Sequence, residues 1–245
     1  PVNGAKGLDP VTGRHDIVPA ARYSRTNQPF LGMPSPTGGH SWQPMSYNPR
    51  TGHVYFPTAE MPYGYVADKP GAFHFAAKGW NTGQDPGKTA MPEDPAVRAQ
   101  IRSMMHGALV AWDPVARKRV WSVPMPTPWN GGTLSTASGL VFQGNSQGEF
   151  AAYDARDGRK LWSYTVPSGI VAPPISRPVD GVQYIAVAVG WGGILPLNMG
   201  EALGQAALPR VNRVIAFRIG GKTKPPAPPA VEQTPLTPPA STASA

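Results

Sequence analysis

The sequence predicts an all-β chain that forms part of a β-propeller, and two observations support this fold class. Asp113 and Trp121 recur as Asp154 and Trp162, in both cases 41 residues later. That distance lies within the roughly 40 to 45 residues of a four-stranded propeller blade. In addition, 28 glycines and 31 prolines among 245 residues interrupt almost every helix-length apolar pattern.

The two repeated segments read as blade hairpins. In each, an apolar stretch predicts a buried strand, an Asp-led turn reverses the chain, and a second strand leads to a tryptophan. Gly158 can adopt the positive φ that such a turn requires. A large aromatic residue at the same place in each repeat suits packing against the next blade. We therefore expect structural roles for Trp112, Trp121 and Trp162, and turn-capping roles for Asp113, Asp154 and Asp157.

Residues 60–105 interrupt the blade pattern and predict a loop excursion. Within it, residues 94–105 combine a capped start with apolar residues at helical spacing, which predicts one surface helix. Long loops on a rigid scaffold often carry function, and here aromatic residues could help to admit an apolar substrate. Scattered aromatics more commonly serve packing, so we expect these to hold the loop against the blades. They are Tyr63, Tyr65, Phe73, Phe75 and Trp80.

The two ends of the chain differ from its middle. The sequence begins at Pro1 with neither an initiator methionine nor a signal peptide, and we interpret this as a cut end. Residues 222–245 contain seven prolines and few large apolar groups, which predicts a disordered tail or linker. Residues 1–221 then amount to about three to four blades. Such an open arc exposes a strand edge, so we expect a fragment of a closed propeller or a second chain that completes it.

Charge and cysteine content narrow the possible functions. Without cysteine the chain has no disulfide, thiolate metal site or c-type haem attachment motif. The formal net charge is +8, but the basic residues are scattered and no nucleic-acid-binding motif accompanies them. A basic face could instead meet an acidic electron-transfer partner or an anionic membrane surface, or simply be solvated. No run of about 18 apolar residues predicts a membrane span.

Five motifs then occur in order along the chain. They are Gly-Leu-Asp-Pro-Val-Thr-Gly-Arg at 7–14, Gly-Gly-His-Ser-Trp at 38–42, Pro-Trp-Asn-Gly-Gly at 128–132, Ser-Gly-Ile-Val-Ala-Pro-Pro at 168–174 and Val-Gly-Trp-Gly-Gly at 189–193. Together with the repeats, they resemble the C-terminal part of a pyrroloquinoline quinone (PQQ)-dependent alcohol dehydrogenase of the quinohaemoprotein type. The resemblance extends to about Gly221. It implies an eight-bladed propeller in the bacterial periplasm, with PQQ near its axis beside a calcium ion.

The resemblance also implies a division of labour. In that family the quinone takes a hydride equivalent from an alcohol, an Asp acts as base, and calcium polarises the quinone carbonyl. The catalytic Asp, the calcium ligands, a vicinal cysteine pair and a Lys or Arg that reaches the quinone all belong upstream of the matched region. We therefore expect no catalytic or metal-ligating residue here, and no alcohol oxidation by this chain alone.

Some cofactor contacts are expected to remain. In the family, an Asn at the position of Ser41 and the Trp that follows it contact PQQ, so Trp42 is the first candidate. The shorter hydroxyl of Ser41 reaches less far than an amide. Trp129 and Asn130 are second candidates and Val171 is a third, through a backbone or apolar contact.

Three residues near the motifs have other possible roles. Trp42 could serve only blade packing. His40 is expected to make a loop hydrogen bond rather than to bind metal, because no second ligand lies at a suitable spacing. Trp191 could line the central funnel or close a turn.

The predicted partners follow from the tail. In quinohaemoproteins such a Pro-rich linker joins the propeller to an electron-accepting cytochrome c domain, so haem c is implied only if such a domain follows. Otherwise a separate cytochrome accepts the electrons. The main alternative is a non-catalytic propeller, a scaffold or outer-membrane assembly factor that binds proteins. That alternative predicts dependence on neither calcium nor quinone.

Overall fold

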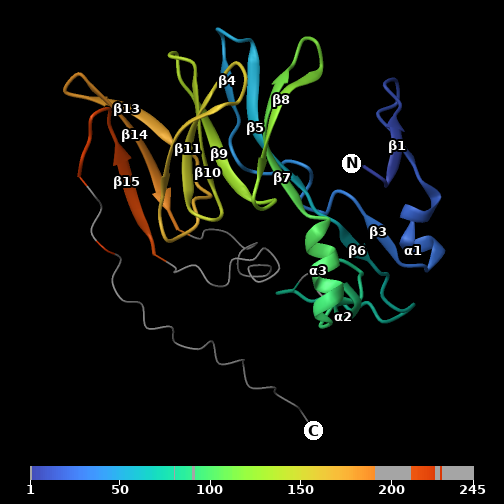
Figure 1. Ribbon diagram of the computed structural model, residues 1–245. Coiled ribbons are helices and arrows are strands. Elements are labelled where there is room, and N and C mark those ends of the chain that lie inside the picture. The colour runs from blue at the N-terminus through green and yellow to red at the C-terminus, as the bar shows by residue number, and fades with distance from the viewer. Residues whose placement is uncertain (1, 80, 90–91, 191–210, 224–226, 228–245) are drawn as a thin grey trace.

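The computed structural model describes residues 2–79, 81–89, 92–190, 211–223 and 227. Three antiparallel sheets stand side by side like the blades of a fan, which confirms the predicted partial propeller (Figure 1). The first sheet has the order β4 (Ser46–Asn48), β5 (His53–Glu60), β7 (His106–Asp113) and β8 (Lys118–Met125). The second has the order β9 (Asn130–Ser135), β10 (Leu140–Asn145), β11 (Glu149–Asp154) and β12 (Lys160–Thr165). The third contains β13 (Ile175–Val179), β14 (Val182–Val189) and β15 (Arg213–Phe217).

Smaller elements flank the first sheet. Two short antiparallel pairs join β1 (Ala5–Leu8) to β2 (His15–Ile17), and β3 (Phe30–Gly32) to β6 (Tyr63–Tyr65). The helical elements are η1 (Pro19–Ala21), α1 (Tyr23–Thr26), α2 (Pro86–Thr89) and α3 (Pro95–Ser103). In the part of the chain that the structure describes, no helix is both long and apolar enough to cross a membrane.

The predicted excursion is an insertion between two paired strands. Glu60 at the end of β5 lies opposite His106 at the start of β7, so the ladder continues as though the intervening residues were absent. The predicted helix within the insertion is confirmed as α3. Asp94 caps its first turn, accepting hydrogen bonds from the backbone N–H groups of Ala96 and Val97.

The two repeated hairpins fold alike. Trp121 on β8 lies opposite Ala111 and Trp162 on β12 lies opposite Ala152, and both ladders shift register one residue later. The expected packing against the next blade is confirmed for Trp121. Its indole N–H donates to the carbonyl of Ala155 in the second sheet at 3.2 Å, and the Tyr55 hydroxyl donates to the same oxygen at 2.8 Å.

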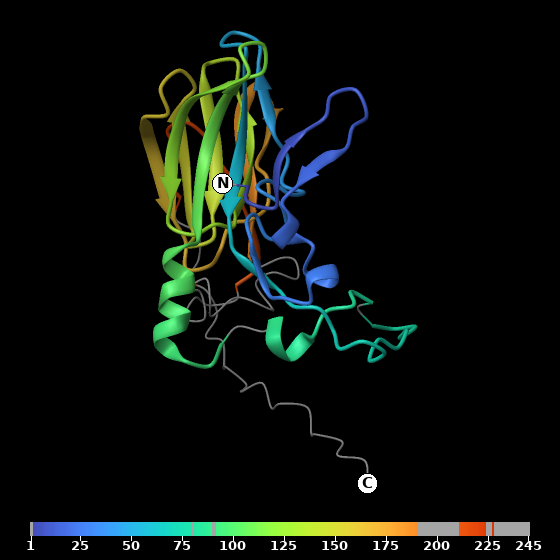
Figure 2. The ribbon, with the colours of Figure 1, turned by 90° about the vertical axis from the view of Figure 1, so that its right-hand side faces the viewer.

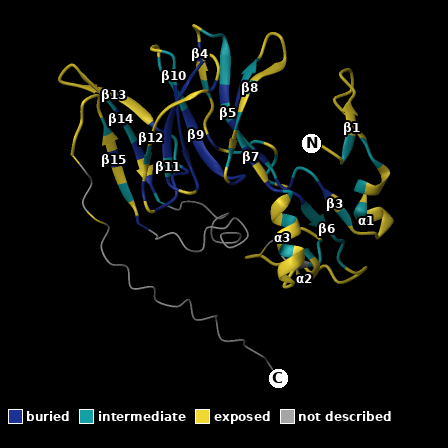
Figure 3. Cartoon of the chain, in the orientation of Figure 1, coloured by how far each residue is buried: buried dark blue, intermediate teal, exposed yellow. Residues whose placement is uncertain are grey.

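The core lies between the sheets (Figure 3). Tyr55, Leu109, Val141 and Tyr153 are among the buried residues between the first and second sheets, and Phe142, Phe150, Ile185 and Ile215 among those between the second and third. In Figure 2, which turns the molecule by 90°, the sheets lie one behind another, as blades around an axis do. Because side chains of adjacent strand positions point to opposite faces, the second sheet contributes to both layers.

One five-residue turn recurs four times, starting at Asp9, Asn48, Asp113 and Asp154. In each copy the side-chain Oδ1 accepts a hydrogen bond from the backbone N–H two residues later, at 2.8–2.9 Å. The predicted capping roles of the aspartates are thereby confirmed, and Asp157 likewise accepts from the Arg159 N–H. The fifth residue always has a positive φ: it is Gly13, Gly52, Arg117 or Gly158.

The aromatic residues of the insertion behave in two ways. Tyr63 and Tyr65 pack against each other with ring centroids 4.9 Å apart, and Tyr65 also packs against Tyr23, as expected of residues that hold the loop. For Phe73 and Phe75 the expectation was wrong, because 51% and 76% of their surfaces are exposed. Trp80 and Trp191 lie outside the described residues, as does most of the tail.

We expect Arg117→Gly to stabilise the protein, because Arg117 occupies a left-handed conformation at φ 54° where the other three copies have glycine. Relief of backbone strain outweighs the added freedom of the unfolded chain by roughly 0.5–1 kcal/mol. Gly158→Ala at the same turn position should destabilise, since a Cβ there would lie 2.7 Å from the Trp121 ring. Thermal unfolding shows whether each variant is more or less stable than the parent protein. A change in the same direction for both would contradict this account.

Acid should weaken the turn at Asp154. Hydrogen bonds from the Arg156 side chain and backbone lower the pKa of this carboxyl to about 2, below its value in the unfolded chain. The stabilisation is therefore complete above about pH 5 and is lost as the pH falls from about 4 through 2. We expect Asp154→Asn to be less stable at neutral pH, with a flatter dependence of unfolding free energy on pH below 5. An unchanged slope would show that other groups dominate the acid response.

Candidate functional site

The segments that lead into β4 and β13, the first strands of the first and third sheets, converge at two glycines of β9. A Cβ on Gly131 would lie 3.0 Å from the carbonyl oxygens of Ile170 and Ala172. A Cβ on Gly132 would lie 2.8 Å from Cδ of Pro44 on one side and 2.9 Å from Cβ of Pro173 on the other. Only glycine allows three backbones to approach this closely.

Two candidate residues lie together at this convergence. The rings of Trp42 and Trp129 are in edge-to-face contact, with centroids 6.5 Å apart and an interplanar angle of 61°. Trp42 precedes β4 and is 53% exposed, whereas Trp129 directly precedes β9 and is only 5% exposed. A half-exposed indole is thus supported by a buried one, which restricts the orientation of its free face.

Val171 joins the same region from a third segment. It belongs to a buried cluster with Trp129, Met61 and Met105, against which Ile101 of α3 packs. Met61 and Met105 are the first and last residues of the insertion, so both ends of the insertion are fixed beneath Trp129. The sequence analysis missed the two methionines. Their placement at both borders of an insertion was the signal available.

Asn130 is fully buried and its amide holds a turn. Its Nδ2 donates to the carbonyl oxygen of Thr127 at 2.7 Å, while its Oδ1 has no hydrogen-bond partner among the described residues. Gly107 on β7 lies directly against this turn, because a Cβ there would overlap the Thr127 backbone. In this structure Asn130 therefore fixes the segment that presents Trp129.

Ser41 and His40 differ in their bonding. The Ser41 side chain is half-buried and makes no hydrogen bond to another described residue. His40 Nδ1 lies 2.8 Å from the carbonyl oxygen of Pro57, and its ring contacts Phe56 edge-on. The predicted loop hydrogen bond of His40 is confirmed.

Among the described residues, no three His, Cys, Asp or Glu side chains lie close enough together to hold a metal ion. Of the five candidate residues, Trp42 and Ser41 are partly exposed, whereas Trp129, Asn130 and Val171 are buried.

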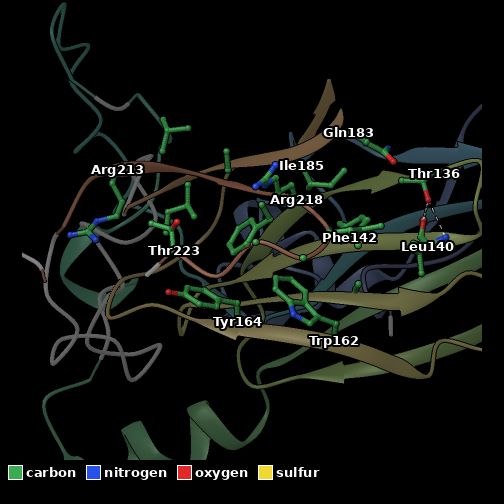
Figure 4. Close-up of a pocket in the computed structure, with 18 of the residues that line it drawn as sticks. Thr136, Leu140, Phe142, Trp162, Tyr164, Gln183, Ile185, Arg213, Arg218 and Thr223 are labelled. Atoms are coloured by element: carbon green, nitrogen blue, oxygen red, sulfur yellow. Dashed lines mark hydrogen bonds between the residues drawn. The ribbon is translucent and has the colours of Figure 1, made fainter. Parts of the chain in front are cut away.

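A large cavity lies elsewhere, beside the edge strand β15 (Figure 4). Its volume is about 1040 Å³, and the rings of Phe142, Trp162, Tyr164 and Phe217 line its wall. Trp162 contacts Phe217 edge-on at 5.2 Å yet remains 40% exposed. Within the described residues the third sheet ends at β15, whereas the other two sheets have a fourth strand at this position.

Comparisons with known proteins give a consistent result. The family model for the β-propeller domain of PQQ glucose/ethanol/alcohol dehydrogenases matches residues 17–185. The chain is 43% identical over 227 residues to the dehydrogenase subunit of the quinone alcohol dehydrogenase of Acetobacter aceti, covering 92% of this chain and 30% of that protein.

Solved structures agree. Quinohaemoprotein alcohol dehydrogenase ADHIIG of Pseudomonas putida is similar with a TM-score of 0.86 and 36% identity, over 96% of this chain and 34% of that one. The quinohaemoprotein alcohol dehydrogenase of Comamonas testosteroni is similar with a TM-score of 0.77 and 37% identity, over 95% and 33%. The chain therefore spans about a third of the length of these proteins.

Truncation of the Asn130 and Ser41 side chains should affect stability differently. Asn130→Ala leaves the buried Thr127 carbonyl without its donor and should cost about 1–3 kcal/mol of stability. Ser41→Ala removes a hydroxyl that has no partner and should change stability by less than about 0.5 kcal/mol. Chemical denaturation of both variants measures the contrast. A neutral Asn130→Ala would mean that the amide does not hold the turn.

Proposed function

Because this chain belongs to the family of the PQQ glucose/ethanol/alcohol dehydrogenase β-propellers, we propose that it is a segment of a PQQ- and calcium-dependent enzyme that oxidises alcohols to aldehydes. The observation on which this proposal depends is the match over residues 17–185, together with the half-exposed Trp42 at the convergence of the sheets. The substrate, cofactor and periplasmic location come from the family resemblance.

The residues of the site fit one side of such a cofactor. PQQ is a planar aromatic molecule, and the free face of Trp42 offers a rigid surface for a planar group. The unbonded hydroxyl of Ser41 beside it can donate to a quinone or carboxylate oxygen. When bound, PQQ supplies the two-electron acceptor for the alcohol.

The other three candidates support Trp42 from the interior of the protein. Trp129 holds the Trp42 ring by its edge-on contact, and Asn130 fixes the turn before Trp129. Val171 belongs to the buried apolar cluster that contains Trp129, and this cluster helps to exclude water from the site. In this proposal Trp42 and Ser41 contact the cofactor, while Trp129, Asn130 and Val171 position them.

The remaining machinery is proposed to belong to the rest of the protein. Since the chain spans about a third of its relatives, we assign the catalytic Asp, the calcium ligands and the missing blades to regions outside this sequence. Within the described residues β15 is the edge strand of the third sheet and an apolar cavity lies beside it; both observations support this assignment, because a sheet edge tends to pair with another strand. A cytochrome c, attached or separate, is the proposed electron acceptor.

The proposed PQQ contacts are tested with variants of Trp42 and Ser41 in the protein that has a complete propeller. Trp42→Ala should lower the affinity for PQQ about tenfold or more, because it removes the aromatic surface. Tyr47→Ala is the matched control, since Tyr47 on the adjacent β4 is similarly exposed at 57% and should leave affinity unchanged. Ser41→Asn should strengthen binding, because an amide reaches further than a hydroxyl. Titration with PQQ in the presence of Ca²⁺, followed by dye-linked alcohol oxidation, measures all three.

The outcomes separate the alternatives. If the complete protein binds no PQQ and oxidises no alcohol, the dehydrogenase proposal fails and the non-catalytic scaffold replaces it. If it binds PQQ but Trp42→Ala and Tyr47→Ala behave alike, the site assignment fails while the enzyme assignment stands.

A further inference from the structure

The insertion ends in a protruding segment, residues 69–79, which we call the finger loop. Its base is closed by antiparallel pairing of Ala67 with Gln84, by a hydrogen bond from the Asp68 N–H to the Gly83 carbonyl at 3.0 Å, and by the Tyr63 hydroxyl on Gln84. Every residue from 69 to 79 is exposed. Figure 2 shows the chain between β6 and α2 reaching away from the sheets.

Local hydrogen bonds shape the finger loop without help from the blades. The Ala72 N–H donates to the Lys69 carbonyl at 2.9 Å, in a turn where Gly71 has a φ of 78°. The Asn81 side chain accepts from the Ala76 N–H at 2.9 Å and donates to the Ala76 carbonyl at 3.0 Å. The loop is therefore a preformed projection whose side chains need no packing against the body of the protein.

Two large apolar side chains lie on this projection. Phe73 and Phe75 are 51% and 76% exposed. Single exposed apolar residues are ordinary, but two phenylalanines two residues apart on a protruding loop form an apolar patch that disfavours solubility. The free energy falls when another surface covers such a patch and removes it from water.

The charge around the two phenylalanines is positive. The finger loop contains Lys69, His74 and Lys78 and no acidic residue. The carboxylates nearest in sequence flank the base and are engaged there: Asp68 accepts from the Lys69 N–H at 2.9 Å, and Asp85 forms an ion pair with Lys88 at 3.8 Å. The tip therefore combines apolar rings with lysine ammonium groups.

We propose that the finger loop docks on an anionic phospholipid surface, with Phe73 and Phe75 entering the interfacial region and Lys69 and Lys78 meeting the phosphate groups. Aromatic side chains favour the boundary between headgroups and acyl chains, and basic residues add attraction to anionic lipids. A protein partner fits less well, because lysine is depleted in the cores of protein interfaces and a narrow convex loop offers little area. Two rings and two lysines give weak, reversible binding.

Vesicle flotation of the protein with a complete propeller tests the proposal. Binding is expected to vesicles of phosphatidylglycerol and phosphatidylethanolamine, but not to phosphatidylcholine alone, and should weaken at high salt. Phe73→Ala/Phe75→Ala should lower the partition coefficient about tenfold or more. The control Val115→Ala removes another exposed apolar residue, 89% exposed and also beside basic residues, on the β7–β8 turn, and should bind like the parent protein.

A second readout follows the ring itself. Phe75→Trp is expected to give tryptophan emission that acrylamide quenches in solution, and that shifts to the blue and is quenched by brominated lipid on vesicles. Emission already shielded from acrylamide without lipid would show that the rest of the protein covers the finger loop, and would overturn the proposal. Salt-sensitive vesicle binding that is unchanged in Phe73→Ala/Phe75→Ala would overturn it too. So would loss of binding to the partner cytochrome, rather than to vesicles, in that double variant.

Discussion

The three sheets can meet at their inner ends only if their backbones pack closely, without side chains between them. Gly131, Gly132 and Gly144 provide this approach at the inner end of the second sheet. A Cβ on Gly144 would overlap the side chain of Ile170, whose N–H bonds to the Asn145 carbonyl at 2.8 Å. The location of the candidate site depends on these contacts, because Trp129 and Val171 lie in the segments that meet there.

The candidate site lies where it does because of this convergence. Trp42, Trp129 and Val171 come from three different segments, each leading into an inner strand. Short connections anchored to these strands thus fix their relative positions, which favours a preformed surface for a planar ligand. The insertion adds support from beneath, through the two methionines at its borders.

Local signals in the sequence predicted much of the fold. The Trp-ended hairpins and the α3 helix could be found because turn residues, caps and spacing are properties of short segments. The third copy of the blade pattern was missed. Phe217 on β15 corresponds to Tyr153 on β11, but the two residues are 64 positions apart, so the period of the first two copies is broken.

The site was harder to predict than the fold. The sequence indicated which residues gather, but not that Asn130 is buried while Trp42 is half-exposed, because burial depends on which faces the neighbouring sheets cover. The exposure of Phe73 and Phe75 was also missed, because composition cannot distinguish a ring that holds a loop from one that the loop displays. Both failures concern non-local packing.

The direct pairing of Glu60 with His106 has a consequence for the evolution of the family. The ladder between β5 and β7 does not depend on what the intervening chain contains, and the entropy of closing a loop rises only with the logarithm of its length, about 0.6 kcal/mol for each doubling. Selection can therefore lengthen or shorten the middle of this insertion at small thermodynamic cost. Its two ends are more constrained, because Met61 and Met105 pack beneath Trp129 and so remain tied to the site.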